Sequence, residues 1–185
     1  MKTEAPVPFA DSIILRPVSP RDARSAFVWM NDPETVKYLG YGFLKPRSFE
    51  SIEEEYRLLS DGEFTGHHFT ILDEDGTRYL GQASLILPDE RAKTAEISLA
   101  LMPDVQGRGI GKQALMTLMR WGFDGCGYQR LHARCLSGNA RAIRLFEAAG
   151  FVREGVLRRH MLMGDGLTDV LLFGMLKEEF RQRYS

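Results

Sequence analysis

Seven residues at positions 106–112, Gln-Gly-Arg-Gly-Ile-Gly-Lys, constrain the fold most, because three glycines lie between an apolar strand-like run and an amphipathic helix-like run. Glycine has no Cβ and adopts backbone angles closed to other residues, so successive N–H groups can converge on one anion. A helix that begins at about Gly109 adds unpaired first-turn N–H groups and the positive end of its dipole. The segment therefore predicts a cradle for a phosphate or pyrophosphate.

Two common phosphate-binding loops do not fit this segment. A Walker A loop needs Gly, four residues, then Gly-Lys and Ser or Thr, but here Gln106 takes the first Gly position and Gln113 follows Lys112. A dinucleotide fingerprint, Gly-x-Gly-x-x-Gly, fails because Lys112 takes its last position. What remains is Gln-x-x-Gly-x-Gly. Taken alone, it also fits a glycine-rich turn that merely ends a strand and starts a helix.

A second segment at positions 139–151, Asn-Ala-Arg-Ala-Ile-Arg-Leu-Phe-Glu-Ala-Ala-Gly-Phe, makes the first more specific. Asn139 is a typical helix N-cap, and Gly150 lies where a left-handed C-terminal cap is expected. With both segments in this order, the chain resembles the GNAT superfamily of N-acetyltransferases from Ile13 to about Leu176. In that family Gln/Arg-x-x-Gly-x-Gly/Ala precedes the third main helix, and Asn-x-x-Ala-x-x-Leu-Tyr/Phe-x-x-x-Gly-Phe follows the next strand.

Residues 29–34 and 155–169 are similar to one branch of that family, the RimJ/RimL-type ribosomal-protein N-terminal acetyltransferases. The branch resemblance implies that a protein N-terminal α-amine is the preferred acetyl acceptor. A small-molecule amine, such as an amino sugar, a polyamine or an antibiotic, is the alternative. A third hypothesis is a non-catalytic sensor that binds acyl-CoA without turnover.

Length and charge favour one cytoplasmic enzyme domain spanning residues 1–185, with its core at about 13–176. No Pro/Ser/Gly linker divides the 185 residues. The 24 basic and 25 acidic side chains nearly balance, which argues against nucleic acid as a partner. The first residues lack the apolar core of a signal peptide, and no apolar run is long enough for a membrane span. Cys126 and Cys135 lack metal-ligand spacing and are expected to be buried or idle thiols. Nothing in the sequence indicates the oligomeric state.

The apolar periodicity predicts an α/β fold, with a mixed, mostly antiparallel sheet of about seven strands and about four flanking helices. Helices are expected after Ser19, after a capping box at Ser51, after the cradle and after Asn139. The helix after the cradle should bury Leu115, Leu118, Met119 and Gly122. Strands are expected at 12–16, 66–73, 78–87, 93–101, 130–135, 159–163 and 170–175. The three strands between 66 and 101 should form an antiparallel meander.

The family resemblance implies the binding site for acetyl-CoA, with no metal required. The pantetheine arm would bond the main chain of Leu99, Ala100 and Leu101 as an added strand does, and Asn139 would bond the same arm. A backbone N–H near Leu101 would polarise the thioester carbonyl. The pyrophosphate would lie on the N–H groups of the cradle, which comprises Gln106, Gly107, Arg108, Gly109, Ile110, Gly111 and Lys112. Arg108 and Lys112 either neutralise phosphates or are only solvated.

Candidate catalytic and acceptor residues are fewer. Glu96 is the only acidic residue inside its predicted strand and is the candidate general base, directly or through water; the alternative is a carboxylate on a solvated strand face. Trp29 and Tyr38 flank the region where this branch receives its acceptor, although aromatic residues at a helix end are often packing residues. The four histidines, at positions 67, 68, 132 and 160, show no clustering that argues for a metal site and are expected to be structural or on the surface.

One departure from the family concerns the leaving thiolate. Phe146 stands at a cofactor-contacting position where many members carry a Tyr whose hydroxyl protonates the thiolate. Ala142 stands where the RimL-type branch carries Ser. Either solvent protonates the thiolate, because thiols are only weakly basic, or another residue does so, with Ser137 and Tyr128 as candidates.

Overall fold

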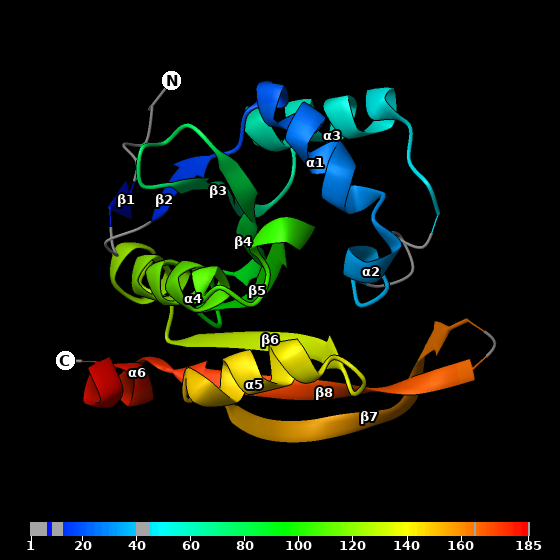
Figure 1. The fold of residues 1–185 in the computed structure, drawn as a ribbon. Coiled ribbons are helices and arrows are strands. Elements are labelled where there is room, and N and C mark those ends of the chain that lie inside the picture. The colour runs from blue at the N-terminus through cyan, green and yellow to red at the C-terminus, as the bar shows by residue number, and fades with distance from the viewer. Residues whose placement is uncertain (1–6, 9–12, 40–44, 165, 185) are drawn as a thin grey trace.

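The computed structural model describes residues 7–8, 13–39, 45–164 and 166–184, which form one eight-stranded sheet with helices on both faces (Figure 1). The strands lie in the order β1-β2-β3-β4-β5-β6-β8-β7. Their bounds are β1 Val7–Pro8, β2 Ile13–Pro17, β3 Gly66–Asp73, β4 Tyr79–Asp89, β5 Thr94–Leu101, β6 Arg130–Leu136, β7 Val152–Met163 and β8 Gly166–Leu176. The predicted class, an α/β fold with a mixed and mostly antiparallel sheet, is confirmed.

Six α-helices occur in the described residues: α1 Ala23–Met30, α2 Pro33–Val36, α3 Phe49–Asp61, α4 Ile110–Arg120, α5 Ala140–Ala148 and α6 Lys177–Tyr184. The sequence predicted four of these, α1, α3, α4 and α5. The short α2 and the C-terminal α6 were missed. Asp32 caps α2 by accepting hydrogen bonds from the Thr35 N–H at 2.9 Å and the Thr35 hydroxyl at 2.6 Å. No helix in the described ranges is long and apolar enough to cross a membrane.

The sheet divides where the only parallel pair among the described strands separates. Strands β2 to β5 pair antiparallel, which confirms the predicted meander. Strand β5 then pairs in parallel with β6 through residues 94–96 alone, although β5 continues to Leu101. Beyond residue 96, β5 no longer pairs with β6, so the second half of the sheet, β6-β8-β7, diverges from β5. A wedge therefore opens beside the C-terminal end of β5.

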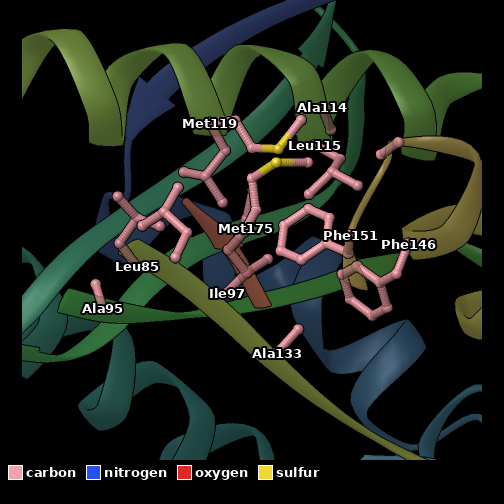
Figure 2. Close-up of a cluster of buried hydrophobic side chains, with 14 of the residues drawn as sticks. Leu85, Ala95, Ile97, Ala114, Leu115, Met119, Ala133, Phe146, Phe151 and Met175 are labelled. Carbon is pink, nitrogen blue, oxygen red and sulfur yellow. The ribbon is translucent and has the colours of Figure 1, made fainter. Parts of the chain in front are cut away.

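Two apolar clusters hold the helices on opposite faces of the sheet. The larger cluster lies between α4, α5 and the sheet, and Figure 2 shows Leu115 and Met119 of α4 packing over Ile97 and Met175. The smaller lies under α1 and α3 and includes Trp29 and Tyr56. The predicted buried stripe of α4 is confirmed, since Leu115, Leu118, Met119 and Gly122 are all buried.

Three predicted element boundaries were wrong, and one of them is that of β8, which begins at Gly166 rather than Val170. Helix α3 begins at Phe49, because Ser48 is its N-cap and accepts a hydrogen bond from the Ser51 N–H at 3.2 Å; Ser51 already lies in the first turn. Strand β7 begins at Val152 rather than Arg159. A register shift between Leu157 and Met161, with Arg159 at φ 49°, breaks the two-residue alternation on which the prediction relied.

Candidate active site

The wedge beside β5 contains a cavity of about 360 Å³ between β5, α2 and the N-terminal ends of α4 and α5. Ten of the predicted site residues line it: Leu99, Ala100, Leu101, Gln106, Gly107, Gly109, Gly111, Lys112, Asn139 and Tyr38. The other five, Arg108, Ile110, Phe146, Trp29 and Glu96, do not line it. The structure therefore brings together most of the two motifs, which the sequence separates by about thirty residues.

The cradle is a run of unpaired backbone donors. Gly107 has φ 79° and Gly109, the N-cap of α4, has φ 86°, and a Cβ on either would meet nothing within 4 Å. The N–H groups of residues 107–111 donate to no atom of the described residues. Unpaired N–H groups at a helix N-terminus bind phosphate well, so the cradle fits the pyrophosphate of a CoA molecule.

Positive side chains around this cavity strengthen the fit. Lys112 and Arg144 line it, and Arg108 stands exposed on the cradle. None of the three forms an ion pair with a residue that the structure describes. Charge neutralisation of CoA phosphates would therefore not require an existing ion pair to break.

Asn139 confirms its predicted structural role. Its Oδ1 accepts a hydrogen bond from the Ala142 N–H at 3.1 Å, which caps α5, and Gly150 ends the helix region at φ 86°. Because Asn139 also lines the cavity, one residue both starts the helix and presents a polar side chain to the site.

Gln106 links the cradle to helix α2. Helix α2 lies on the side of the cavity near Tyr38, where the family resemblance implies that the amine binds, and this side is called the acceptor side. Its Nε2 donates to the Thr35 hydroxyl and to the Leu101 carbonyl, both at 3.1 Å, and its Oε1 accepts from the Arg141 guanidinium. Thr35 belongs to the short helix α2 and is itself held by Asp32. The side chain of Gln106 thereby fixes α2, the end of β5 and the start of α5 against one another. No sequence pattern indicated this link, because α2 was not predicted.

Glu96 is buried, with 8% of its surface exposed, so the alternative of a solvated strand face is wrong. Its Oε1 accepts from Arg134 Nε at 3.0 Å, and its Oε2 lies 3.0 Å from the second Arg134 nitrogen. His132, its parallel partner on β6, has Nε2 3.8 Å from the same carboxylate. Burial lowers the pKa of His132, against the opposing effect of the Glu96 charge. A largely neutral imidazole therefore lies beside the candidate base.

The two residues predicted to contact the acceptor, Trp29 and Tyr38, differ in their position relative to the cavity. Tyr38 lines the cavity. Trp29 is buried in the smaller cluster, where its Nε1 donates to the Tyr79 hydroxyl at 3.0 Å. The packing alternative therefore describes the position of Trp29.

The candidates for protonating the thiolate lie away from the cavity. Phe146 is buried, with its ring centroid 5.3 Å from that of Phe151 and 5.6 Å from that of Phe173 (Figure 2). Ser137 and Tyr128 do not line the cavity either, and the Tyr128 hydroxyl is buried with no hydrogen-bond partner in the described residues. Protonation by solvent remains the simplest prediction.

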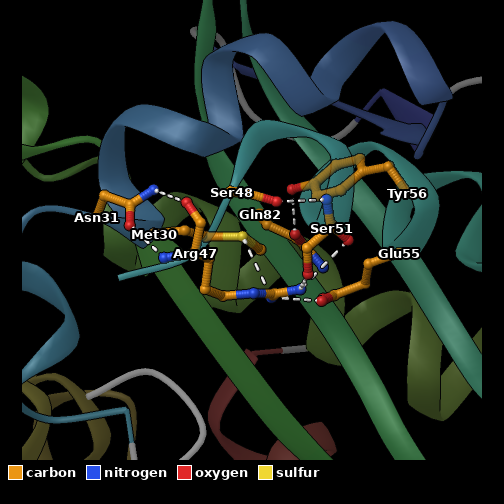
Figure 3. Close-up of polar contacts among 8 residues, drawn as sticks. All are labelled: Met30, Asn31, Arg47, Ser48, Ser51, Glu55, Tyr56 and Gln82. Carbon is orange, nitrogen blue, oxygen red and sulfur yellow. Dashed lines mark hydrogen bonds and ion pairs between the residues drawn. The ribbon is translucent and has the colours of Figure 1, made fainter. Parts of the chain in front are cut away.

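A polar cluster stabilises the joint between α1 and α3 (Figure 3). The Asn31 side chain pairs with the backbone of Arg47, accepting from its N–H at 2.8 Å and donating to its carbonyl at 3.1 Å. The Arg47 guanidinium lies 2.5 Å from a Glu55 carboxylate oxygen and 3.1 Å from the Ser51 hydroxyl. These contacts hold the residues just before α3 against the C-terminal end of α1.

The family follows from comparison with known proteins. Residues 12–152 match the family model described as an acetyltransferase (GNAT) domain, which is well over half of the chain. The chain belongs to the GNAT family of acetyltransferases; it is an N-acetyltransferase, and acetyl-CoA is its cosubstrate. No group of three or more His, Cys, Asp or Glu side chains in the described residues is arranged to hold a metal ion.

Three individual similarities place the chain more closely. It is 25% identical over 175 residues to the uncharacterized N-acetyltransferase p20 of Bacillus licheniformis, covering 93% of this chain and 97% of p20. Spermidine N-acetyltransferase of Vibrio cholerae, solved with CoA and spermine, superimposes with a TM-score of 0.82 at 23% identity, covering 91% and 98% of the two chains. RimL, a ribosomal L7/L12 α-N-protein acetyltransferase solved with coenzyme A, gives 0.83 at 17% identity, covering 95% and 99%. At these identities the two solved structures show a shared fold, and the RimJ/RimL branch is not distinguished from the spermidine enzymes.

Proposed function

We propose that this enzyme acetylates the N-terminal α-amine of a polypeptide in preference to a polyamine. The observation that carries the proposal is the charge balance of the acceptor side. Three acidic side chains there, Glu34, Glu55 and Glu96, are already paired with cations. A polyamine carries several positive charges and would find little to neutralise them.

Three acids have a positive partner, and Glu34 among them lines the cavity; Asp32, which caps α2, forms no ion pair with a described residue. Glu34 of α2 pairs with Lys37 at 2.5 Å. Glu55 of α3 pairs with Arg47, and Glu96 of β5 pairs with Arg134. A second ammonium group would have to displace one of these cations.

The chain's own residues suffice for direct transfer between two bound substrates. When bound, acetyl-CoA supplies a thioester carbonyl and a thiolate leaving group. The end of β5, fixed through the Leu101 carbonyl by Gln106, offers its main chain to the pantetheine arm and to the developing negative charge. Nitrogen attack forms the amide bond, the carbon–sulfur bond breaks, and the ammonium proton passes to a base.

Glu96 with its neighbour His132 is the candidate acceptor of that proton. Arg134 holds the Glu96 carboxylate in place, so a proton must compete with a guanidinium for its oxygens. A weak or distant base is adequate for an α-amine of pKa near 8, because roughly a tenth to a fifth of it is neutral at pH 7.4, against about a thousandth of an alkylamine of pKa near 10.4. This difference also supports an α-amine acceptor.

The test is thiol release from acetyl-CoA with a panel of amines at neutral pH. The panel contains short peptides with a free N-terminus, the same peptides with a blocked N-terminus and an internal lysine, spermidine and an amino sugar. The proposal expects the highest kcat/KM for free N-termini and little turnover of the blocked peptides. Faster turnover of spermidine would assign the enzyme to polyamines, and binding of acetyl-CoA with no turnover of any amine would favour the sensor hypothesis.

A further inference from the structure

A wide bulge in β7 presents basic side chains beside the active site. Between the pairs Leu157↔Val170 and Met161↔Thr168, β7 advances four residues while β8 advances two. The two extra residues of β7 are not paired with β8, and the bulge interrupts the normal alternation of side chains along the strand. They form a hollow lined by Val156, Leu157, Arg158, Arg159, His160 and Asp169.

Backbone pairing places this hollow close to the cavity. Ser137, two residues before the cavity residue Asn139, donates its N–H to the Asp169 carbonyl at 3.0 Å, and its hydroxyl lies 3.3 Å from that of Thr168. The bulge lies on the next strand, β7. Neighbouring strands are about 4.8 Å apart, so the bulge is about 10 Å from the end of β6, which leads into the cavity.

The hollow has an excess of positive charge. Arg158, Arg159 and His160 are exposed, and none forms an ion pair with a residue that the structure describes. The one described acid there, Asp169, accepts the backbone N–H of Arg159 at 2.7 Å and so stabilises the bulge itself. The two guanidinium groups are therefore available to an outside carboxylate.

We propose that the basic bulge binds an acidic side chain of the acceptor polypeptide, three to five residues after the reacting amine. An extended peptide advances about 3.3 Å per residue, so this spacing covers the distance from the cavity to the bulge. Paired arginines bind carboxylates well because each can donate two hydrogen bonds in a plane. The inference rests on the proposed function, because only a polypeptide acceptor reaches both places.

The experiment measures kcat/KM for peptides that share the first two residues and carry a single Asp, Asn or Lys at each of positions 3 to 7. The enzyme variants are R158E/R159E and, as a matched control on the same strand, R153E. Arg153 is exposed and lies outside the hollow. The expected result is an Asp preference over Lys of about tenfold, centred at positions 4 to 6, that weakens with salt.

The double variant should reverse this order and favour Lys, whereas R153E should keep the wild-type order. Acetyl-CoA affinity should be unchanged in both variants, which also reports that they are folded. Equal rates for Asp, Asn and Lys peptides, or an Asp preference that survives in R158E/R159E, would overturn the inference and leave the peptide acceptor intact. Failure to acetylate any peptide would instead remove the proposed function.

Discussion

The cofactor side and the acceptor side of the cavity are built by different means. The cofactor side depends on local backbone: two left-handed glycines, a helix start at Ile110 and a capping asparagine. The acceptor side depends on side-chain contacts between distant positions; Gln106 and Thr35 are 71 residues apart in the sequence, and Glu96 and Arg134 are 38 apart. Short motifs therefore indicate acetyl-CoA directly, whereas the acceptor has to be inferred from the assembled charges.

The two sides also differ in their charges. Around the cradle, Arg108, Lys112 and Arg144 have no ion-pair partner among the described residues, as expected for a site that receives phosphates. On the acceptor side, Glu34, Glu55 and Glu96 are paired. Substitutions on each side can therefore test acetyl-CoA binding and acceptor chemistry separately.

The largest expected effect is on the acceptor chemistry. Glu96→Gln should lower kcat/KM by about 100-fold near neutral pH, because general-base catalysis contributes at least that much. The defect should shrink as pH rises toward the pKa of the amine, and it should be milder for N-terminal peptides than for alkylamines. A pH–rate series on both substrates measures it. A loss that is the same at every pH and for every acceptor would show that Glu96 only positions the strand or the substrate.

The next effect is on the cofactor side. Gly109→Val should weaken acetyl-CoA binding by about 10- to 30-fold, because a left-handed backbone costs a residue with a side chain roughly 1–2 kcal/mol and the N-cap would reorient. Calorimetric titration measures the affinity. Gly62→Val is the matched control, since Gly62 has φ 76°, meets nothing within 4 Å and ends α3 away from the cavity. Equal acetyl-CoA affinity in both variants would remove the cradle from the site.

A smaller effect should appear at the link between the two sides. Gln106→Leu should raise the acceptor KM by about tenfold, because α2 loses its hydrogen bond to the cradle. Thr35→Val should act similarly, and the double variant should add little, since both changes break the same contact. Fully additive effects on KM would show that the two residues act independently.

Features that depend on local residue types could be predicted from the sequence, whereas features that depend on contacts between distant residues could not. The meander, the cradle and the α5 caps were predicted because each depends on local residue types and on alternation. Helix α2 was missed because it is a single turn without apolar periodicity. The burial of Glu96 was missed because its partner Arg134 comes from a parallel strand, and the β7 boundary because a bulge breaks the alternation.

The smallest expected effect concerns stability at mildly acidic pH. Burial lowers the pKa of both His68 and His132 below the usual 6.5. The unfolded chain therefore binds protons first, and the free energy of unfolding should fall as pH drops through about 6.5 toward the folded-state pKa values. Urea unfolding between pH 5.5 and 8 measures it. The variant His68→Gln/His132→Gln should show a flatter profile, and an unchanged slope would contradict the assignment.

We propose that the acceptor side selects a polypeptide α-amine over a polyamine, and direct competition between the two substrates tests this selectivity best. The enzyme is given acetyl-CoA with equal concentrations of spermidine and a peptide that has a free N-terminus and Asp at position 5. Mass spectrometry of the products gives the ratio of the two kcat/KM values, because competing substrates partition by that ratio. Acetylated peptide should exceed acetylated spermidine by at least about tenfold. A product mixture dominated by acetylspermidine would contradict the account.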